Sequence, residues 1–280
     1  MAEAERSFVK TVFRLEEIDK DLFRGDHMRS VSMTRVFGGQ IASQALVAAQ
    51  CTVSNEQTVH SLHTYFLRPG DLSVPILYRV THLRDGRSFA SRSVEAIQRG
   101  RFIAHVVLSF QTPEISSSSI VHQVPMPRAP DPDTLEAMID PFRVRGFGVS
   151  ESNDSLPSFE FRDATNFAEW AATRRVWLKA VNASFDNSIF HSALLALISD
   201  SFFISAALRT HSSFQFGMAT SLDHSIYFHS TSVRADDWIL FDVESSRASN
   251  NRALGTGRLY ARDGTLIMTA VQEALIRPKL

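Results

Sequence analysis

The stretch Gly257-Arg-Leu-Tyr-Ala-Arg-Asp-Gly-Thr-Leu-Ile-Met-Thr-Ala-Val-Gln-Glu-Ala-Leu275 has the pattern of a β-hairpin. Its centre, Asp263-Gly264, is a strong turn signal because both residues tolerate positive φ. Side chains alternate along a strand, so every second residue of the final arm shares one face. That face carries Leu266, Met268, Ala270, Gln272 and Ala274. Gln272 is the hydrogen-bonding member of an apolar row, and a buried polar group costs free energy unless it is paired.

A second stretch, Val94 to Gln111, repeats the hairpin pattern without a polar residue on its apolar face. Matching Gly100 with Gly264, and the preceding segments by their aromatic residues, aligns the two halves of the chain. The alignment sets Val47 against Asp200, Val59 against Ser221 and Leu108 against Gln272. One half of a duplicated domain therefore keeps three polar residues where the other has hydrocarbon.

Each half is predicted to be one helix followed by antiparallel strands. Helices are expected over residues 40–50 and 188–205, the second capped by Asp186, Asn187 or Ser188. Strands are expected over 59–67, 74–83, 89–98, 102–111, 219–229, 238–245, 258–262 and 266–275. Seven of the ten prolines lie between Pro113 and Pro157, which indicates a linker over 113–157 between units 1–112 and 158–280. The fold class is α+β, with each sheet wrapped on its helix.

Composition excludes several classes of protein. A net charge of -1 over 280 residues gives no bulk electrostatic case for nucleic acid or anionic membrane, so an anionic ligand needs local arginines. The single cysteine, Cys51, excludes a disulfide framework and a cysteine-rich metal site, and it favours a reducing compartment. No signal peptide and no membrane span are expected, because no run of about 18 apolar residues occurs.

The polar trio has the chemistry of a hydrolytic site. Partial burial of Asp200 would raise the pKa of its carboxyl and make it a better base near neutral pH. The amide of Gln272 can donate and accept at once, and could hold a water or orient the carboxylate. Ser221 is less supported, because its strand face is not apolar and no Gly-x-Ser-x-Gly elbow occurs.

Beyond the trio, the chain resembles the acyl-CoA thioesterase II family of double hotdog hydrolases, with bacterial and peroxisomal members. The resemblance rests on Val36-Phe-Gly-Gly-Gln40, His60-Ser-Leu-His63, Phe66-Leu-Arg-Pro-Gly-Asp71, Leu83-Arg-Asp-Gly-Arg-Ser-Phe89, Ser199-Asp200, Ser221-Leu-Asp-His224, Trp238 and Val271-Gln-Glu273. It implies two hotdog units, each a long helix cupped by an antiparallel sheet, with the first unit's site degenerate.

The resemblance also implies hydrolysis of acyl-CoA thioesters by an Asp, a Ser or Thr, and a Gln, which fall on Asp200, Ser221 and Gln272. Asp200 would take a proton from the attacking water, and backbone amides at Gly38 and Gly39 would stabilise the oxyanion. Acyl-CoA is the expected substrate, without a cofactor or a metal ion. The protein is expected to be a homo-oligomer.

Two other functions remain open at this stage. Asp186 and His191 resemble the dyad of hotdog enoyl-CoA hydratases, although an N-cap aspartate and a first-turn histidine give the same pattern. A non-catalytic acyl-CoA binding protein would bind the same ligand without releasing CoA.

The tail of the chain is similar to a peroxisomal address. Its last three residues, Pro278-Lys-Leu280, differ from Ser-Lys-Leu in the first position. We therefore expect recognition by the peroxisomal import receptor or, failing that, a cytoplasmic location.

Overall fold

The computed structural model describes residues 13–27, 34–114, 120–138, 158–166, 172–181 and 188–279. The N-terminal half contains β1 (Glu16–Asp19), β2 (Leu22–Gly25), α2 (Gly38–Gln50), β3 (Thr58–Phe66), β4 (Ile76–Asp85), β5 (Phe89–Gln98) and β6 (Arg101–Gln111). The C-terminal half contains β7 (Ser158–Asp163), β8 (Thr173–Val181), α4 (Ser188–Ser199), α5 (Phe203–Leu208), β9 (Phe216–Ser221), β10 (Asp223–Phe228), β11 (Ile239–Ser249), β12 (Arg252–Ala261) and β13 (Leu266–Pro278). A short 3-10 turn, η2 (Pro132–Thr134), lies between them.

The strands form one antiparallel sheet that runs through both halves. Its order is β1-β2-β4-β5-β6-β3-β10-β13-β12-β11-β8-β7, with β9 paired to β13. The series β4-β5-β6-β3 is mirrored by β11-β12-β13-β10, and the halves meet where β3 pairs with β10. The predicted α+β class and the two hotdog units are confirmed.

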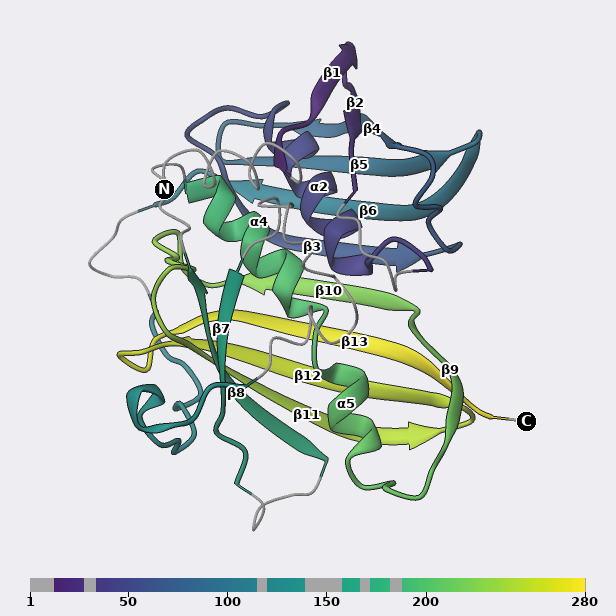
Figure 1. Ribbon diagram of the computed structural model, residues 1–280. Helices are drawn as coiled ribbons and strands as arrows, with labels where there is room; N and C mark the ends of the chain where they lie inside the picture. Colours follow the sequence, from purple (N-terminus) through teal and green to yellow (C-terminus); the bar gives the residue numbers. More distant parts are fainter. Residues whose placement is uncertain are drawn as a thin grey trace.

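Helices α2 and α4 lie side by side on one face of this sheet (Figure 1). Most residues of both helices are buried. The two helices pack against each other, α2 contacts β3 to β6, and α4 shares one hydrophobic core with the sheet. Each helix carries buried alanines, such as Ala45 and Ala196, whose small side chains leave room for close packing. The two central helices therefore bring the end of α4 to the beginning of α2.

The second helix is shorter than predicted. It ends at Ser199, and α5 begins only at Phe203, because Phe202 has a left-handed backbone conformation with φ of 71°. A right-handed helix cannot continue through such a residue. Asp200 therefore lies in the break between the two helices. Among the proposed caps, Ser188 is the first residue of α4, and Asp186 and Asn187 lie outside the described residues.

The strand expected over 219–229 is also interrupted. Its first part is β9, which pairs with the end of β13, and its second part is β10, which pairs with β3 and the middle of β13. Ser221 is the last residue of β9 and therefore lies at the bend. Both predicted hairpins are present, and Gln272 shares a buried face with Met268 and Ala270.

The described part of the predicted linker lies against the C-terminal half. Gln123 donates to the carbonyl of Gly264, and the indole of Trp177 donates to the carbonyl of Pro130. Arg262 forms ion pairs with Asp131 and with Asp133 of η2. The domain boundaries themselves stay a prediction.

One described stretch, Ser188–Leu208, is long and apolar enough by composition to cross a membrane. This qualifies the expectation that no such stretch occurs. The stretch contains α4 and α5 and is mostly buried within the fold. Core helices have the same composition, so this is weak evidence for a membrane span.

Candidate active site

Asp200 lies where the C-terminus of α4 meets the N-terminus of α2. Its side chain is largely buried, with 8% of the residue exposed. The backbone N–H of Gly39 donates to Oδ2 of Asp200 at 2.8 Å. This amide is one of those that the first turn of a helix leaves without an internal acceptor, and the helix dipole there favours a negative charge.

Gly38 and Gly39 allow this approach. A Cβ at Gly39 would lie 2.2 Å from the carbonyl oxygen of Leu197, and a Cβ at Gly38 would lie 2.8 Å from Oδ2 of Asp200. The first distance involves backbone, which has no freedom to move aside. The absence of side chains at Gly38 and Gly39 therefore allows the first turn of α2 to bring its free N–H groups close to the carboxylate of Asp200.

Ser221 and Gln272 complete a chain of hydrogen bonds to Asp200. The hydroxyl of Ser221 donates to Oδ1 of Asp200 at 2.9 Å, and Nε2 of Gln272 donates to Oγ of Ser221 at 2.7 Å. Gln272 is 1% exposed. The three residues proposed from the sequence are thus brought together, with Gln272 reaching Asp200 through Ser221.

The buried ring of His224 lies next to this chain. Its Nε2 is 2.8 Å from Oγ of Ser199, and the ring of Phe203 packs edge-on against it. Burial lowers the pKa of His224 to about 3, and hydrogen bonding with Gln272 opposes this lowering in part. The imidazole is therefore neutral at physiological pH.

Sequence reasoning gave no role to Ser199 or His224, although both stand in the motifs that carried the resemblance. The alignment of the two halves contains the missing signal, because it sets Leu46 against Ser199 and Leu62 against His224.

In the N-terminal half, the equivalent positions form ordinary core. They are Leu46, Val47, Val59, Leu62 and Leu108, each with 7% exposure or less. The structure supports the alignment: Leu108 of β6 pairs with Leu62 of β3, and β13 places Gln272 opposite His224 one step beyond the Val271–Ser225 pair. Within the described residues, the polar set occurs in the C-terminal half alone.

Two cavities open beside the trio. One of about 380 Å³ is lined by Asp200 and Ser221 together with Phe202 and Ile204. The other, of about 240 Å³, is lined in part by Phe66, Arg68 and Leu275. Both cavities share residues of β9, of the first turn of α2 and of the segment before it, namely Arg35, Val36, Gly38, Met218, Thr220 and Ser221. The trio therefore lies at a junction with two arms, built from both halves of the molecule.

The alternative dyad is placed differently. His191, in the first turn of α4, is 2% exposed, and its Nδ1 accepts a hydrogen bond from the N–H of Ala235 at 3.2 Å. Asp186 lies outside the described residues. Asp200 follows His191 by nine positions, which corresponds to about 13 Å along a helix axis. No described contact joins His191 to the trio.

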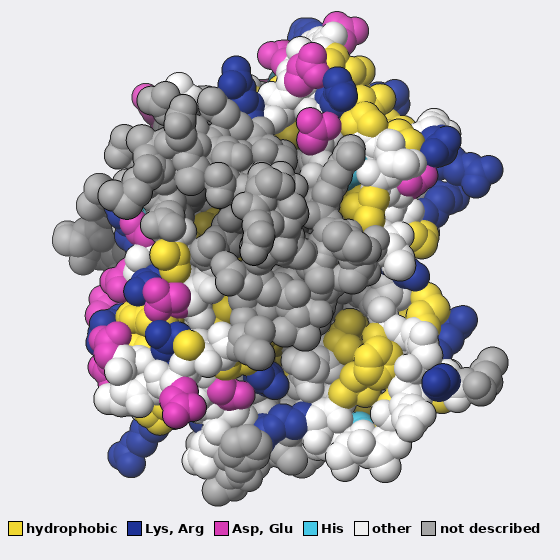
Figure 2. Space-filling model, in the orientation of Figure 1, with side chains coloured by type: hydrophobic (Ala, Val, Ile, Leu, Met, Phe, Trp, Pro, Cys, Tyr) yellow, Lys and Arg dark blue, Asp and Glu magenta, His cyan; other side chains and the backbone are white. Residues whose placement is uncertain are grey.

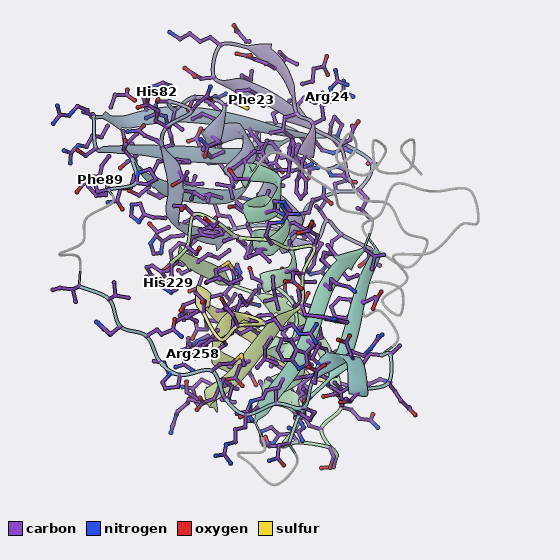
Figure 3. All side chains as sticks on the ribbon, turned by 90° about the vertical axis from the view of Figure 1, so that its left-hand side faces the viewer. Phe23, Arg24, His82, Phe89, His229 and Arg258 are labelled. Carbon is purple, nitrogen blue, oxygen red and sulfur yellow. The ribbon has the colours of Figure 1, made fainter. Side chains whose placement is uncertain are left out.

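The arginines are spread over the molecule. Basic and acidic side chains both occur around the edge of the visible face in Figure 2. In the turned view of Figure 3, Arg258 and His229 lie on the side of the sheet away from α2 and α4. Among the described arginines, Arg35 and Arg68 line the cavities beside the trio.

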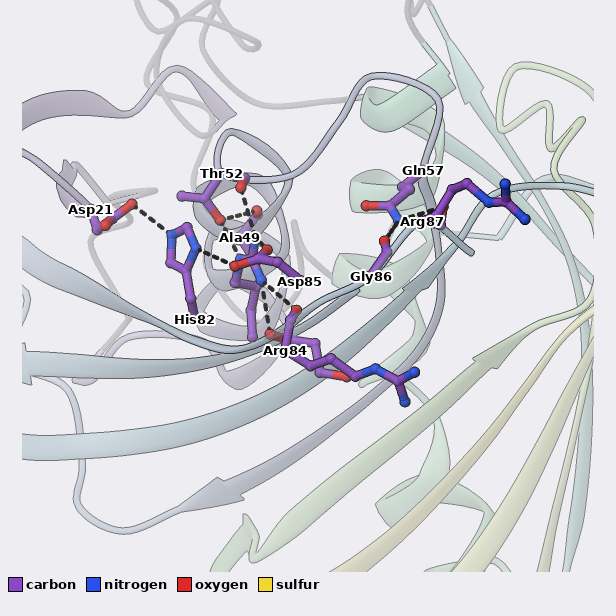
Figure 4. Close-up of polar contacts among 11 residues, drawn as sticks. Asp21, Ala49, Thr52, Gln57, His82, Arg84, Asp85, Gly86 and Arg87 are labelled. Carbon is purple, nitrogen blue, oxygen red and sulfur yellow. Dashed lines mark hydrogen bonds and ion pairs between the residues drawn. The ribbon is translucent and has the colours of Figure 1, made fainter. Parts of the chain in front are cut away.

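Arg92 has a structural role. It is 1% exposed, donates to the carbonyl and hydroxyl oxygens of Thr52 just after α2, and pairs with Asp85. Figure 4 shows His82 beside this cluster, between Asp21 and Asp85. The cluster ties the end of α2 to the β4–β5 hairpin.

Comparisons with known proteins agree with this geometry. Residues 27–111 match the acyl-CoA thioesterase N-terminal domain, and residues 161–275 match the acyl-CoA thioesterase family. The chain is 38% identical to acyl-coenzyme A thioesterase 8 of Mus musculus, over 97% of this chain and 89% of that protein. It is similar to the crystal structure of an acyl-CoA thioesterase II from Mycobacterium marinum, with a TM-score of 0.83, 32% identity, and coverage of 97% and 98% of the two chains.

A more distant match is the peroxisomal acyl-coenzyme A thioester hydrolase 1 of Saccharomyces cerevisiae. It is 29% identical over 56% of this chain and 46% of that protein. The two family matches, the near-complete coverage and the shared fold lead to one conclusion. The chain belongs to the acyl-CoA thioesterase family.

Proposed function

We propose that this protein hydrolyses acyl-CoA thioesters to free acid and CoA, with Asp200, Ser221 and Gln272 as its catalytic residues. The observation that carries the proposal is the directed chain of hydrogen bonds from Gln272 through Ser221 to Asp200. Family membership supports the reaction class. The hydrocarbon at the equivalent N-terminal positions supports the placement of a single site in the C-terminal half.

Asp200 acts as the general base. The hydroxyl of Ser221 and the amide of Gly39 each donate to one of its oxygens, so the orientation of the carboxylate is fixed. Because the carboxylate of Asp200 is largely buried, few water molecules can reach it. A water at the cavity junction can transfer a proton to this carboxylate while the water oxygen attacks the thioester carbon. Ser221, which lines both cavities, fixes the position of that water, and Gln272 holds Ser221 in place.

The amide of Gly38 stabilises the oxyanion. Gly38 is the first residue of α2, so its N–H has no acceptor within the helix, and the residue lines both cavities. Gly39, the other candidate, already donates to Asp200. The departing CoA is a thiol with an ordinary pKa near 8.5, so it leaves without a strong general acid.

The two arms of the cavity hold the two parts of the substrate. The thioester lies at the junction beside Gly38 and Ser221, with the acyl chain in one arm and the pantetheine in the other. Arg35 and Arg68 are the cavity-lining cations, and they attract the phosphates of CoA.

Replacing Asp200 by Asn tests the proposal. We expect hydrolysis of acyl-CoA, followed as free thiol release over a series of chain lengths, to fall by about 10²- to 10⁴-fold because the base is lost. Full activity of this variant would remove Asp200 from the mechanism. Binding of acyl-CoA by the wild-type protein without thiol release would indicate the non-catalytic binder, and hydration of crotonyl-CoA that depends on His191 would indicate the hydratase.

For the cellular location, we propose peroxisomal import through Pro278-Lys-Leu280. The yeast relative's description as peroxisomal supports this. The backbone N–H of Lys279 donates to the carbonyl of Gln215, so the end of β13 must detach before a receptor can bind the tail. Deleting the last three residues should move a fluorescent fusion from peroxisomes to the cytosol. The expected homo-oligomer stays a prediction, which analytical ultracentrifugation can test.

A further inference from the structure

Two buried polar atoms, one in the trio and one next to it, have no hydrogen-bond partner of normal geometry in the described structure. They are Nδ1 of His224 and Oε1 of Gln272. An unsatisfied buried polar atom is expensive, and native proteins retain few of them. Their occurrence next to a catalytic residue therefore requires an explanation.

The two atoms belong to cross-strand neighbours. Ser225 of β10 pairs with Val271 of β13, and the next step of the same register places His224 opposite Gln272. Both side chains are buried, at 0% and 1% exposure, so they lie on the same inner face. Directly opposite residues have Cβ atoms about 5 Å apart, which is within reach of a hydrogen bond between their side chains. Hydrogen bonding with Gln272 also enters the balance that sets the protonation of the ring.

The position of one proton on the ring decides whether both atoms are satisfied. If the proton is on Nε2, then Nδ1 and Oε1 are both acceptors and neither has a donor. If it is on Nδ1, that N–H can donate to Oε1 of Gln272, and both atoms gain a partner.

The other end of the ring permits this second tautomer. Oγ of Ser199 lies 2.8 Å from Nε2 of His224 and 3.0 Å from the carbonyl oxygen of Ala196. The hydroxyl hydrogen can turn from the carbonyl to the ring nitrogen, so that Nε2 accepts.

We propose that His224 is a positioning residue for the reaction, neutral and protonated on Nδ1, whose donation to Oε1 of Gln272 sets the orientation of that amide. The amide then presents its NH₂ group, rather than its oxygen, to Ser221. Ser221 in turn commits its hydroxyl hydrogen to Asp200. The inference rests on the proposed function of Asp200, Ser221 and Gln272.

The result is a continuous series of donors that ends on the carboxylate. It runs from Ser199 to His224, Gln272, Ser221 and Asp200. Reversing the Gln272 amide would put its oxygen against Ser221 and draw the hydroxyl hydrogen away from Asp200. The carboxylate would then lose one of the hydrogen bonds that orient it. His224 thus acts on Asp200 through two intermediates and does not touch the substrate.

The tautomer is tested first, in the wild-type protein, by ¹⁵N NMR of labelled histidine at neutral pH, with His224→Phe used to assign the signals. We expect a protonated Nδ1 and a bare Nε2. A proton on Nε2, or on both nitrogens, would overturn the proposal.

Kinetics test the role. His224→Phe removes the donor, and we expect kcat to fall by about 10- to 100-fold with KM nearly unchanged. His224→Asn can place an amide N–H where Nδ1 lies, and should recover about tenfold of that loss. His229→Phe, on the outer face just after β10, is the matched control and should keep wild-type rates. Equal losses in the Phe and Asn variants would contradict the proposal.

A double-mutant cycle separates this role from a purely structural one. If His224 acts through Gln272, then His224→Phe should have little further effect on kcat in a Gln272→Ala background. Additive losses would overturn the positioning role. Failure of the proposed function is recognised separately, because Asp200→Asn would then remain active whatever His224 does.

Discussion

The two halves of this molecule share one architecture and differ in what fills it. Around the junction of helix and sheet, the N-terminal half has five buried aliphatic residues: Leu46, Val47, Val59, Leu62 and Leu108. The C-terminal half has Ser199, Asp200, Ser221, His224 and Gln272 at the equivalent places. The comparison shows that the fold does not need the polar set, because one half folds around hydrocarbon. Burying polar groups has a cost in free energy that the fold does not require, and this supports the proposal that the polar set serves catalysis.

The neighbouring strand differs in a matching way. Leu108 pairs with Arg92 of β5, whereas Gln272 pairs with Gly255 of β12. A Cβ at Gly255 would lie 2.7 Å from the ring of Phe203, so the glycine makes room for α5 to pack on His224. In the N-terminal half, Arg92 uses the same position to tie down the end of α2. Gly255 thus allows α5 to pack beside the end of α4, whereas Arg92 holds the end of α2 directly.

The largest expected effect comes from exchanging the residues at the equivalent positions 47 and 200, which are Val47 in the N-terminal half and Asp200 in the C-terminal half. Asp200→Val should lower kcat by about 10²- to 10⁴-fold while the protein stays folded, because it recreates the N-terminal core. The reverse change, Val47→Asp, should leave activity per folded molecule unchanged but destabilise the fold by about 3–5 kcal/mol, since a charge is buried without a partner. Thiol release and urea unfolding measure the two effects. Unfolding of Asp200→Val would contradict the equivalence of the halves.

Gly39→Ala should be next in size. The new Cβ meets the backbone oxygen of Leu197, so α2 must move away from α4. We expect a loss of about 2 kcal/mol or more in the free energy of unfolding, together with a fall in kcat as Asp200 loses the Gly39 amide. Gly100→Ala is the control: it faces open space at positive φ and should cost about 1 kcal/mol without affecting kcat. If Gly39→Ala and Gly100→Ala had the same kcat and the same free energy of unfolding, Gly39 would have no role in positioning Asp200.

Gln272→Leu should have a smaller effect on rate and a moderate cost in stability. It copies Leu108, and it removes the oxygen that is proposed to accept the Nδ1 proton of His224. We expect kcat to fall by about 10- to 100-fold. The free energy of unfolding should fall by about 1–3 kcal/mol, because the buried N–H of His224 loses its acceptor. The double variant with His224→Leu, which copies Leu62, should recover that loss. A destabilised protein with normal kcat would indicate that Gln272 is structural.

The smallest effect is on the pH dependence of stability. His224 has a folded pKa of about 3 and an ordinary unfolded value near 6.5. Between these values the unfolded chain binds the proton and the folded chain does not, so the contribution of His224 is complete above pH 6.5 and is lost as the pH falls. The slope is at most about 1.4 kcal/mol per pH unit. Urea unfolding from pH 7.5 to 4 should show this excess slope in the wild type relative to His224→Phe, and parallel slopes would contradict a buried neutral ring.

Much of the architecture could be predicted from periodicity and turns. The hairpin of β12 and β13 follows from its alternation around Asp263-Gly264, and α2 follows from helical spacing. Strands β1, β2 and β7 were missed because they have only four to six residues each. Strand β8 lies inside the sheet, and it was missed because Arg174, Arg175 and Lys179 interrupt its apolar pattern. The break at Asp200 could not be foreseen, since Phe202 gives no local signal for a left-handed conformation.

The site was predictable to the extent that polar residues interrupt apolar rows. Gln272 was found in this way, and Asp200 followed from the comparison of the halves. His224 was missed because histidine on a buried strand face has no distinctive pattern until its partner across the sheet is known. The donation from Gly39 to Asp200 joins residues 161 positions apart, and only the packing of α2 on α4 reveals it.

Attack by water on the thioester, with Asp200 as the base, is tested most directly by a single turnover in ¹⁸O-labelled water with enzyme in excess over acyl-CoA. If water attacks the thioester, the released acid carries ¹⁸O and the peptide that contains Asp200 carries none. If Asp200 attacks as a nucleophile and water then opens the mixed anhydride at the aspartyl carbon, the label appears in that peptide and is missing from the acid. The first result is predicted, and the second would contradict the role of Asp200 as a general base.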